Sequence, residues 1–130
     1  MKKALLSLVT IYLLFSSSIV KSDSKINITV KESTDFTGKE FKRNEEGCGL
    51  QKKQKGNRDK ESVLNIFYSK NSTIKGGIFE CSLQNVIYAK WNLNLIISSV
   101  NASRGSDNAF EIRNSNAIIK DSINNNLFTI

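Results

Sequence analysis

Short apolar runs rich in β-branched residues, separated by clusters of asparagine, serine and glycine, most limit what this 130-residue chain can form. Proline is absent and helical periodicity is poor. Runs of this kind, bounded by turn-forming residues, are typical of β-strands. We therefore expect an all-β protein. The runs occupy residues 26–30, 63–68, 83–88, 93–100, 109–112 and 117–123.

A weak internal repeat points to how these strands are arranged. Residues 72–78, 82–87 and 117–123 share one pattern: an inward apolar pair, a polar or small turn position, then another apolar residue. Stacked short strands with Asn, Ser and Gly at the corners favour a parallel β-helix, in which each coil buries its face against the next. An antiparallel sandwich with Asn-rich turns fits the repeat equally well.

The first residues have the order of a secretory signal peptide. Lys2 and Lys3 precede an apolar run at residues 4–15, and a small, polar stretch follows up to Ser22. The run is shorter than the roughly 20 residues that span a bilayer. We expect residues 1–22 to be removed, residues 23–130 to form one domain, and the mature protein to be secreted, extracellular and free of the membrane.

Composition narrows the chemistry that is available. Histidine is absent, which excludes His-based acid–base catalysis and His-ligated metal sites. The two cysteines, Cys48 and Cys81, are expected to pair in an oxidising compartment, with two free thiols as the alternative. In a eukaryotic secretory pathway, three sequons would be acceptors for N-glycosylation, at Asn27, Asn71 and Asn101.

Several side chains are candidates for contact with an acidic ligand. The lysine-rich stretch at residues 45–61 is expected to be a solvated loop, with contact to a polyanion as the alternative. No aromatic-interleaved basic motif accompanies it, so we expect no nucleic-acid partner. Trp91 and Tyr88 either stack on sugar rings or pack against the sheet. Lys90, Arg104 and Lys120 either meet carboxylates or face water.

Short segments across the chain, taken in order, resemble the secreted pectate lyases of polysaccharide lyase family 3. Residues 35–41 (Asp-Phe-Thr-Gly-Lys-Glu-Phe) are similar to the Phe-Asp-Gly-Lys-Gly element of that family, and residues 81–86 (Cys-Ser-Leu-Gln-Asn-Val) to its Cys-Thr-Ile-Glu-Asn-Val strand. Each match is short, and their order is the evidence. The other similar segments are residues 28–31, 49–55, 64–67, 72–78, 101–103, 106–110 and 118–121.

The resemblance implies a right-handed, single-stranded parallel β-helix and a lineage that acts on pectate (polygalacturonate) or another acidic polysaccharide. In this family calcium bridges protein carboxylates and the uronate of the substrate, and a basic side chain removes the C5 proton in a β-elimination. The resemblance thus implies a pectate lyase with a calcium cofactor. It also retains Asp107 as a substrate-binding candidate, with Glu80 and Asp107 as candidate metal ligands.

The matched positions lack most of this machinery. The family carries acidic residues where this chain has Ala89 and Lys90, and its lysine falls on Asn108. Its later lysine and arginine would lie at or beyond Ile130, so no catalytic residue is matched and the domain is expected to be incomplete at its C-terminus. A non-catalytic extracellular carbohydrate-binding or effector protein on the same scaffold is the alternative.

Overall fold

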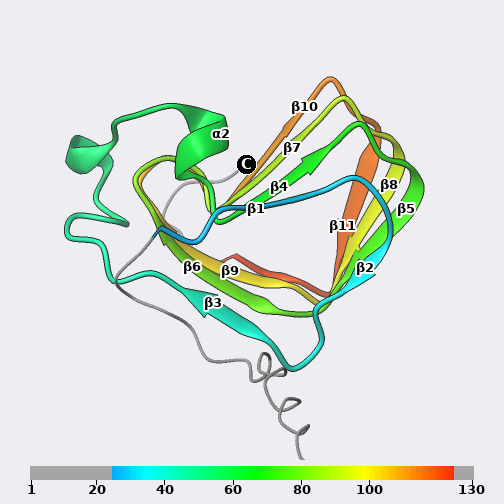
Figure 1. Ribbon diagram of the computed structural model, residues 1–130, viewed down its shortest axis with the longest axis horizontal. Helices are drawn as coiled ribbons and strands as arrows, with labels where there is room; N and C mark the ends of the chain where they lie inside the picture. Colours follow the sequence, from blue (N-terminus) through cyan, green and yellow to red (C-terminus); the bar gives the residue numbers. More distant parts are fainter. Residues whose placement is uncertain (1–24, 125–130) are drawn as a thin grey trace, which may run out of the picture.

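The protein is all-β and is built from three parallel sheets (Figure 1). The computed structural model describes residues 25–124, so the predicted signal peptide and the last residues of the predicted domain lie outside the described residues. The strands are β1 (Ile28–Val30), β2 (Thr34–Asp35), β3 (Glu40–Lys42), β4 (Leu64–Phe67), β5 (Lys70–Lys75), β6 (Ile78–Ser82), β7 (Ile87–Lys90), β8 (Leu93–Ser98), β9 (Asn101–Gly105), β10 (Phe110–Arg113), β11 (Ala117–Lys120) and β12 (Ile123–Asn124).

The chain visits the three sheets in a fixed rotation. Sheet A has the order β1-β4-β7-β10, sheet B the order β11-β8-β5-β2 and sheet C the order β12-β9-β6-β3, so every third strand returns to the same sheet one layer further on. Each strand pair described is parallel, which excludes the antiparallel sandwich and is compatible with the predicted parallel β-helix. We call the four turns of the chain coils 1 to 4.

The register between coils places like residues above one another. Leu64 of β4 is paired with Ile87 of β7, which is paired with Phe110 of β10, a spacing of 23 residues at each step. In sheet B, Ile74 is paired with Ile97. All five of these side chains are buried, so the interior is a set of apolar columns enclosed by the three sheets (Figure 1). Such columns bury apolar surface at every step of the winding.

The corners between sheets explain the abundance of asparagine. Asn92 is buried, yet its amide nitrogen donates to the Ile66 carbonyl at 2.8 Å and its oxygen accepts from the Ser69 N–H at 2.9 Å. Asn71 and Asn94 both have positive φ, and the Asn94 amide donates to the Asn71 oxygen at 2.8 Å. Asparagine tolerates left-handed backbone angles, and its side-chain amide can form hydrogen bonds to polar groups of a neighbouring coil, which suits it to these positions.

The structure confirms most of the predicted strands and corrects one. The run at residues 83–88 was expected to be a strand, but β7 begins at Ile87 and residues 83–86 form the turn that leads into it. In that turn the Gln84 N–H donates to Ser82 Oγ at 2.9 Å. Leu83 and Val86 are apolar because the turn is buried, which a run of apolar letters does not distinguish from a strand.

One long connection interrupts the regular winding. Residues 43–63 join β3 to β4 and contain η1 (Gln51–Lys53) and α2 (Arg58–Glu61), whereas four residues suffice to join β6 to β7. We call residues 43–63 the insertion. Residues 45–61 were expected to be a solvated loop, and most of them are exposed, but Cys48 and Glu61 are buried. Neither helix among residues 25–124 is long and apolar enough to cross a membrane.

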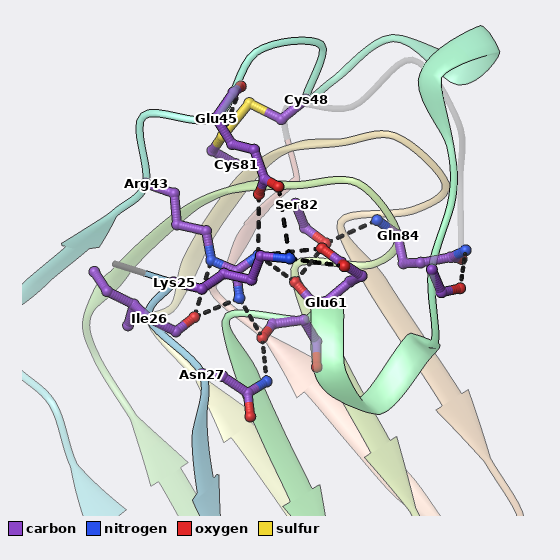
Figure 2. A network of polar contacts seen from close by, with 12 residues as sticks. Lys25, Ile26, Asn27, Arg43, Glu45, Cys48, Glu61, Cys81, Ser82 and Gln84 are labelled. Atoms are coloured by element: carbon purple, nitrogen blue, oxygen red, sulfur yellow. Dashed lines mark hydrogen bonds and ion pairs between the residues drawn. A yellow bond between two sulfur atoms is a disulfide. The ribbon is translucent and has the colours of Figure 1, made fainter. Parts of the chain in front are cut away.

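A buried arginine ties the insertion to the first coil (Figure 2). Arg43 Nε donates to the Ile26 carbonyl at 2.9 Å, Nη2 donates to the Ser62 carbonyl at 2.8 Å, and Nη1 donates to the Glu61 carbonyl. The carboxylates of Glu45 and Glu61 lie 3.6 and 3.9 Å from Nη1. A buried guanidinium requires partners of this kind, because an unpaired buried charge is strongly unfavourable.

A disulfide provides the second attachment. Cys48 of the insertion is bonded to Cys81 of β6, so the predicted pairing is present and closes a loop with a sequence separation of 33 residues. A cross-link of this span stabilises a small domain by about 3–4 kcal/mol in the chain-entropy model. The insertion is therefore attached to the first coil through Arg43 and to β6 through Cys48.

Shortening one core side chain tests the columns directly. Ile97→Ala removes a fully buried side chain from the middle of the sheet B column, and we expect it to lower the free energy of unfolding by about 2–5 kcal/mol. Urea unfolding followed by circular dichroism measures this. Ile118→Ala is the matched control, because Ile118 is 60% exposed on β11 and its loss is expected to change stability by less than about 0.5 kcal/mol. Equal effects of the two substitutions would contradict the assigned register.

Candidate functional site

Two large aromatic side chains lie exposed and parallel at the corner where sheet A leads into sheet B. Tyr68 follows β4 and Trp91 follows β7, so they occupy the same place in successive coils. Their ring centroids are 4.9 Å apart with an interplanar angle of 19°, and the residues are 61% and 43% exposed. We call this pair the aromatic platform. A paired, solvent-facing aromatic surface is unusual on a small protein and marks a candidate contact site.

The backbone explains why these side chains point outward. Tyr68 and Trp91 have φ of 59° for each residue, in the left-handed region that bulky residues rarely adopt. The corner is stabilised by the next coil, because the Tyr68 N–H donates to the Lys90 carbonyl and the Trp91 N–H to the Arg113 carbonyl. Unusual backbone angles that the surrounding structure enforces often accompany functional side chains.

A lysine ammonium lies directly against the platform. Lys90 Nζ is 4.0 Å from the Trp91 ring centroid, 5.4 Å from that of Tyr88 and 5.8 Å from that of Phe67. The rings of Phe67 and Tyr88 meet edge to face at 5.7 Å and support the lysine from the sheet side. Contacts to ring faces position the ammonium without using an anionic partner. Its positive charge is not neutralised by a carboxylate among the described residues.

A second cation stands one strand away from Lys90. Arg113 is paired with Lys90 in the register of sheet A, which places their backbones about 4.8 Å apart. Arg113 Nε donates to Glu111 Oε2, and Arg58 Nε of α2 donates to Glu111 Oε1 at 3.1 Å. The insertion thus reaches sheet A at Glu111.

The Glu111 carboxylate organises these cations. Burial by itself raises its pKa, but hydrogen bonds from Arg113 and Asn85 and the charges of Arg58 and Arg113 outweigh burial and hold the pKa below its ordinary value of 4.5. The hydrogen bond to Glu111 in turn raises the pKa of Arg113. Both groups are therefore charged at neutral pH, and Arg113 is oriented by a fixed partner.

The structure does not bring the predicted substrate-binding residues together. Lys90 lies in sheet A beside the platform, whereas Lys120 ends β11 in sheet B and Arg104 lies on β9 in sheet C. Asp107 lies in the connection between β9 and β10, and its N–H donates to the Gln84 carbonyl at 2.9 Å. Of the predicted cations, only Lys90 belongs to the candidate site.

For the aromatic side chains, the structure separates the two alternatives, packing against the sheet and exposure to a ligand. Tyr88 is only 3% exposed and packs behind Lys90, so it is not available to stack on a sugar ring. Tyr68 takes that place beside Trp91. Sequence reasoning missed Tyr68, Arg58, Glu111 and Arg113. The 23-residue spacing of Tyr68 and Trp91 is the signal from which the platform could have been found.

The residues present do not fit calcium. Glu80, one candidate ligand, is engaged by Arg104 Nη1 at 2.8 Å, and the candidate Asp107 lies in a different element. Among residues 25–124 no group of three or more acidic, histidine or cysteine side chains is placed to hold a metal ion. Calcium takes six to eight oxygen ligands, so we derive no step through it.

The three sequons differ in the freedom of their side-chain nitrogen. The Asn27 amide donates to the carbonyls of Asp59 and Ser62 at 2.9 and 2.7 Å. Asn101 is half-buried at the start of β9. Asn71 is exposed, and its side chain accepts from Asn94. Glycosylation at each of these positions stays a prediction.

Comparison with known proteins identifies no relative: no family model matches the chain, and neither a curated protein nor a solved structure matches it.

The ion cluster around Glu111 predicts a pH dependence. Because the folded pKa of Glu111 is lowered, its stabilising contribution is present above the ordinary value of 4.5 and is lost as the pH falls through the folded pKa. We expect Glu111→Gln to be less stable than the wild type near pH 7, with the difference shrinking below about pH 4.5.

Thermal melting of both proteins across pH 3–7 measures this difference. Glu40→Gln is the control for the loss of one negative charge. Glu40 is exposed, and its ion pair with the exposed Lys42, at 3.5 Å, is of a kind that contributes little to stability. A Glu111→Gln difference that stays constant from neutral to acid pH would contradict the ion cluster.

Proposed function

We propose that this protein binds acidic polysaccharides outside the cell, with pectate as the first candidate, through the aromatic platform and the cations beside it. The observation that carries the proposal is the exposed, parallel pair of Tyr68 and Trp91 with the Lys90 ammonium 4.0 Å from the Trp91 ring. Because the two rings stack on each other, the C–H face of a sugar ring would contact the face of Tyr68 or Trp91 that the other ring leaves uncovered. A neighbouring ammonium is suited to the carboxylate of a uronate.

The charge of the molecule supports the same ligand class. The full chain has a net charge of +7, and removal of residues 1–22 with Lys2, Lys3 and Lys21 leaves 16 basic and 12 acidic side chains, a net charge of +4. Lys90 and Arg113 lie one strand apart in sheet A. A basic protein attracts anionic chains at long range, and this attraction weakens as salt screens it. Neutral polysaccharides would use the platform alone and bind less tightly.

The finer features of the resemblance belong to this proposal. We propose a right-handed winding of the coils, in keeping with the handedness of nearly all crossover connections between parallel strands. We also propose export directed by residues 1–22, and no nucleic-acid or membrane partner. A protein on this lineage that works outside the cell would meet acidic cell-wall polysaccharides.

β-Elimination of pectate, which requires calcium in the resembling family, is the second candidate. The ordered segment matches and the parallel stacked sheets favour it, whereas residues 25–124 provide no calcium site. We place recognition first because the aromatic platform needs only residues that the structure describes. Ultraviolet absorbance of unsaturated product, after incubation with polygalacturonate and calcium, tests cleavage separately from binding.

The fluorescence of Trp91 reports the proposed site directly, because it is the single tryptophan of the chain. We expect oligogalacturonates to change its emission with a saturable, salt-sensitive dependence. Fully methyl-esterified oligomers, which lack the carboxylates, are expected to bind at least tenfold more weakly, about 1.4 kcal/mol.

Retention on a polygalacturonate matrix then assigns the residues. Trp91→Ala, Tyr68→Ala and Lys90→Met are each expected to elute at lower salt than the wild type. Leu93→Ala is the matched control, since Leu93 is 53% exposed on β8 outside the platform. Unchanged elution of the three platform variants, or an equal response to esterified oligomers, would contradict the proposed function.

A further inference from the structure

A hollow lies between the insertion and the turn that follows β6. Its volume is about 560 Å³, which falls within the roughly 300–1,000 Å³ of small-ligand sites. Three lysines of the insertion line it, Lys52, Lys53 and Lys55, and Leu83 provides an apolar contribution from the turn. None of these residues belongs to the aromatic platform or to the ion cluster around Glu111.

The walls of this hollow are joined to each other. The Lys55 N–H donates to the Leu83 carbonyl at 3.1 Å, and Gln54 Nε2 donates to Gln84 Oε1 at 3.2 Å. Gln84 Nε2 donates in turn to the Gly56 carbonyl at 2.9 Å. Together with the disulfide, these contacts hold the insertion to the turn, so the hollow has a defined shape rather than being a gap beneath a loose loop.

The acidic side chains nearby do not neutralise the lysines. The Glu45 carboxylate also borders the hollow, but its oxygens lie 3.6 Å from Arg43 Nη1 and 3.7 Å from Lys25 Nζ. Figure 2 shows Glu45 between the disulfide and Arg43, at the network that includes Glu61. The exposed Glu46 is the other acid in the lining.

None of the three lysines is ion-paired with another residue of the described chain. Since Glu45 is paired with Arg43 and Lys25, three ammoniums face one remaining carboxylate, that of Glu46, in the lining of the hollow. This concave surface has an excess of positive charge, and an anion can contact more than one ammonium there.

Packing against a glycine positions the central lysine. Gly47 has φ of +89°, and a Cβ added to it would lie 3.0 Å from Lys53 Cγ and 3.1 Å from Lys53 Cβ. The aliphatic stem of Lys53 thus lies over the Gly47 backbone, which limits the conformations open to its ammonium. Ordering a lysine in advance lowers the entropic cost of using it in binding.

We propose that this hollow is a second anion subsite, which binds one or more carboxylate- or sulfate-bearing sugar units of an acidic oligosaccharide. An oligosaccharide fits better than a lone inorganic anion, because the hollow is large and Leu83 offers apolar surface to a sugar ring. The class of ligand rests on the proposed function, whereas the site itself rests on the hollow and its unpaired lysines.

Nuclear magnetic resonance of the ¹⁵N-labelled full-length mature protein, titrated with trigalacturonate, tests the proposal. We expect saturable shifts of the amides of Lys53 and Leu83, separate from those of Tyr68 and Trp91. In a Lys52→Gln/Lys53→Gln/Lys55→Gln variant the shift of Leu83 is expected to need at least tenfold more ligand, while the shift of Trp91 keeps its wild-type midpoint. The matched control, Lys31→Gln/Lys39→Gln/Lys42→Gln, removes the same charge from exposed positions outside the hollow and should leave both responses unchanged.

The outcomes separate this inference from the proposed function. Shifts at Trp91 without shifts at Leu83 would overturn the second subsite alone, and shifts at Leu83 without shifts at Trp91 would overturn the platform alone. A control variant that weakens Leu83 as much as the hollow variant would overturn the site in favour of net charge. A last titration uses sodium sulfate at matched ionic strength. If it shifts the Leu83 amide at the same concentrations as trigalacturonate, the proposal that the hollow binds a saccharide is overturned.

Discussion

Parallel backbone pairing between coils, in a fixed register, is the constraint on which the rest of this structure depends. Because Leu64, Ile87 and Phe110 occupy one paired position, their side chains enter one apolar column. The same register places outward-facing residues of successive coils side by side, and it brings Lys90 next to Arg113. The platform of Tyr68 and Trp91 is the same effect one residue further along, at the corner.

The insertion has no coil of its own, and it is held by other means. Arg43 donates to the carbonyl of Ile26, just before β1, and to that of Ser62, near the end of the insertion. Cys48 of the insertion is bonded to Cys81. A buried guanidinium with carboxylate partners is weak evidence for stability but restricts the arrangement of the groups around it. Two contacts of the insertion depend on that arrangement: Arg58 reaches Glu111 in sheet A, and Lys53 lies over Gly47 in the hollow.

The short apolar runs predicted β1, β4, β8, β10 and β11, but not the more polar β2, β3, β6 and β9, and not how the strands pair. β2 was missed because Thr34–Asp35 is two residues long and polar, and it is defined by its pairing with β5 rather than by its own pattern. Lys90 and Trp91 were identified from residue type alone. Tyr68 and Arg113 become visible only when the 23-residue spacing between paired strands is known, since they are distant in sequence from those residues. The ion pair of Arg104 with Glu80 joins successive coils and could not be read from residues near either in sequence.

The most direct test of this account is where a bound sugar lies on the protein. Intermolecular nuclear Overhauser effects between oligogalacturonate ring protons and the protein identify the side chains in contact with the ligand. If the platform binds the sugar, we expect cross-peaks from sugar C–H protons to the ring protons of Trp91 and Tyr68 and to the Lys90 side chain. Cross-peaks that involve only residues of sheet C, with none to either ring of the platform, would contradict it.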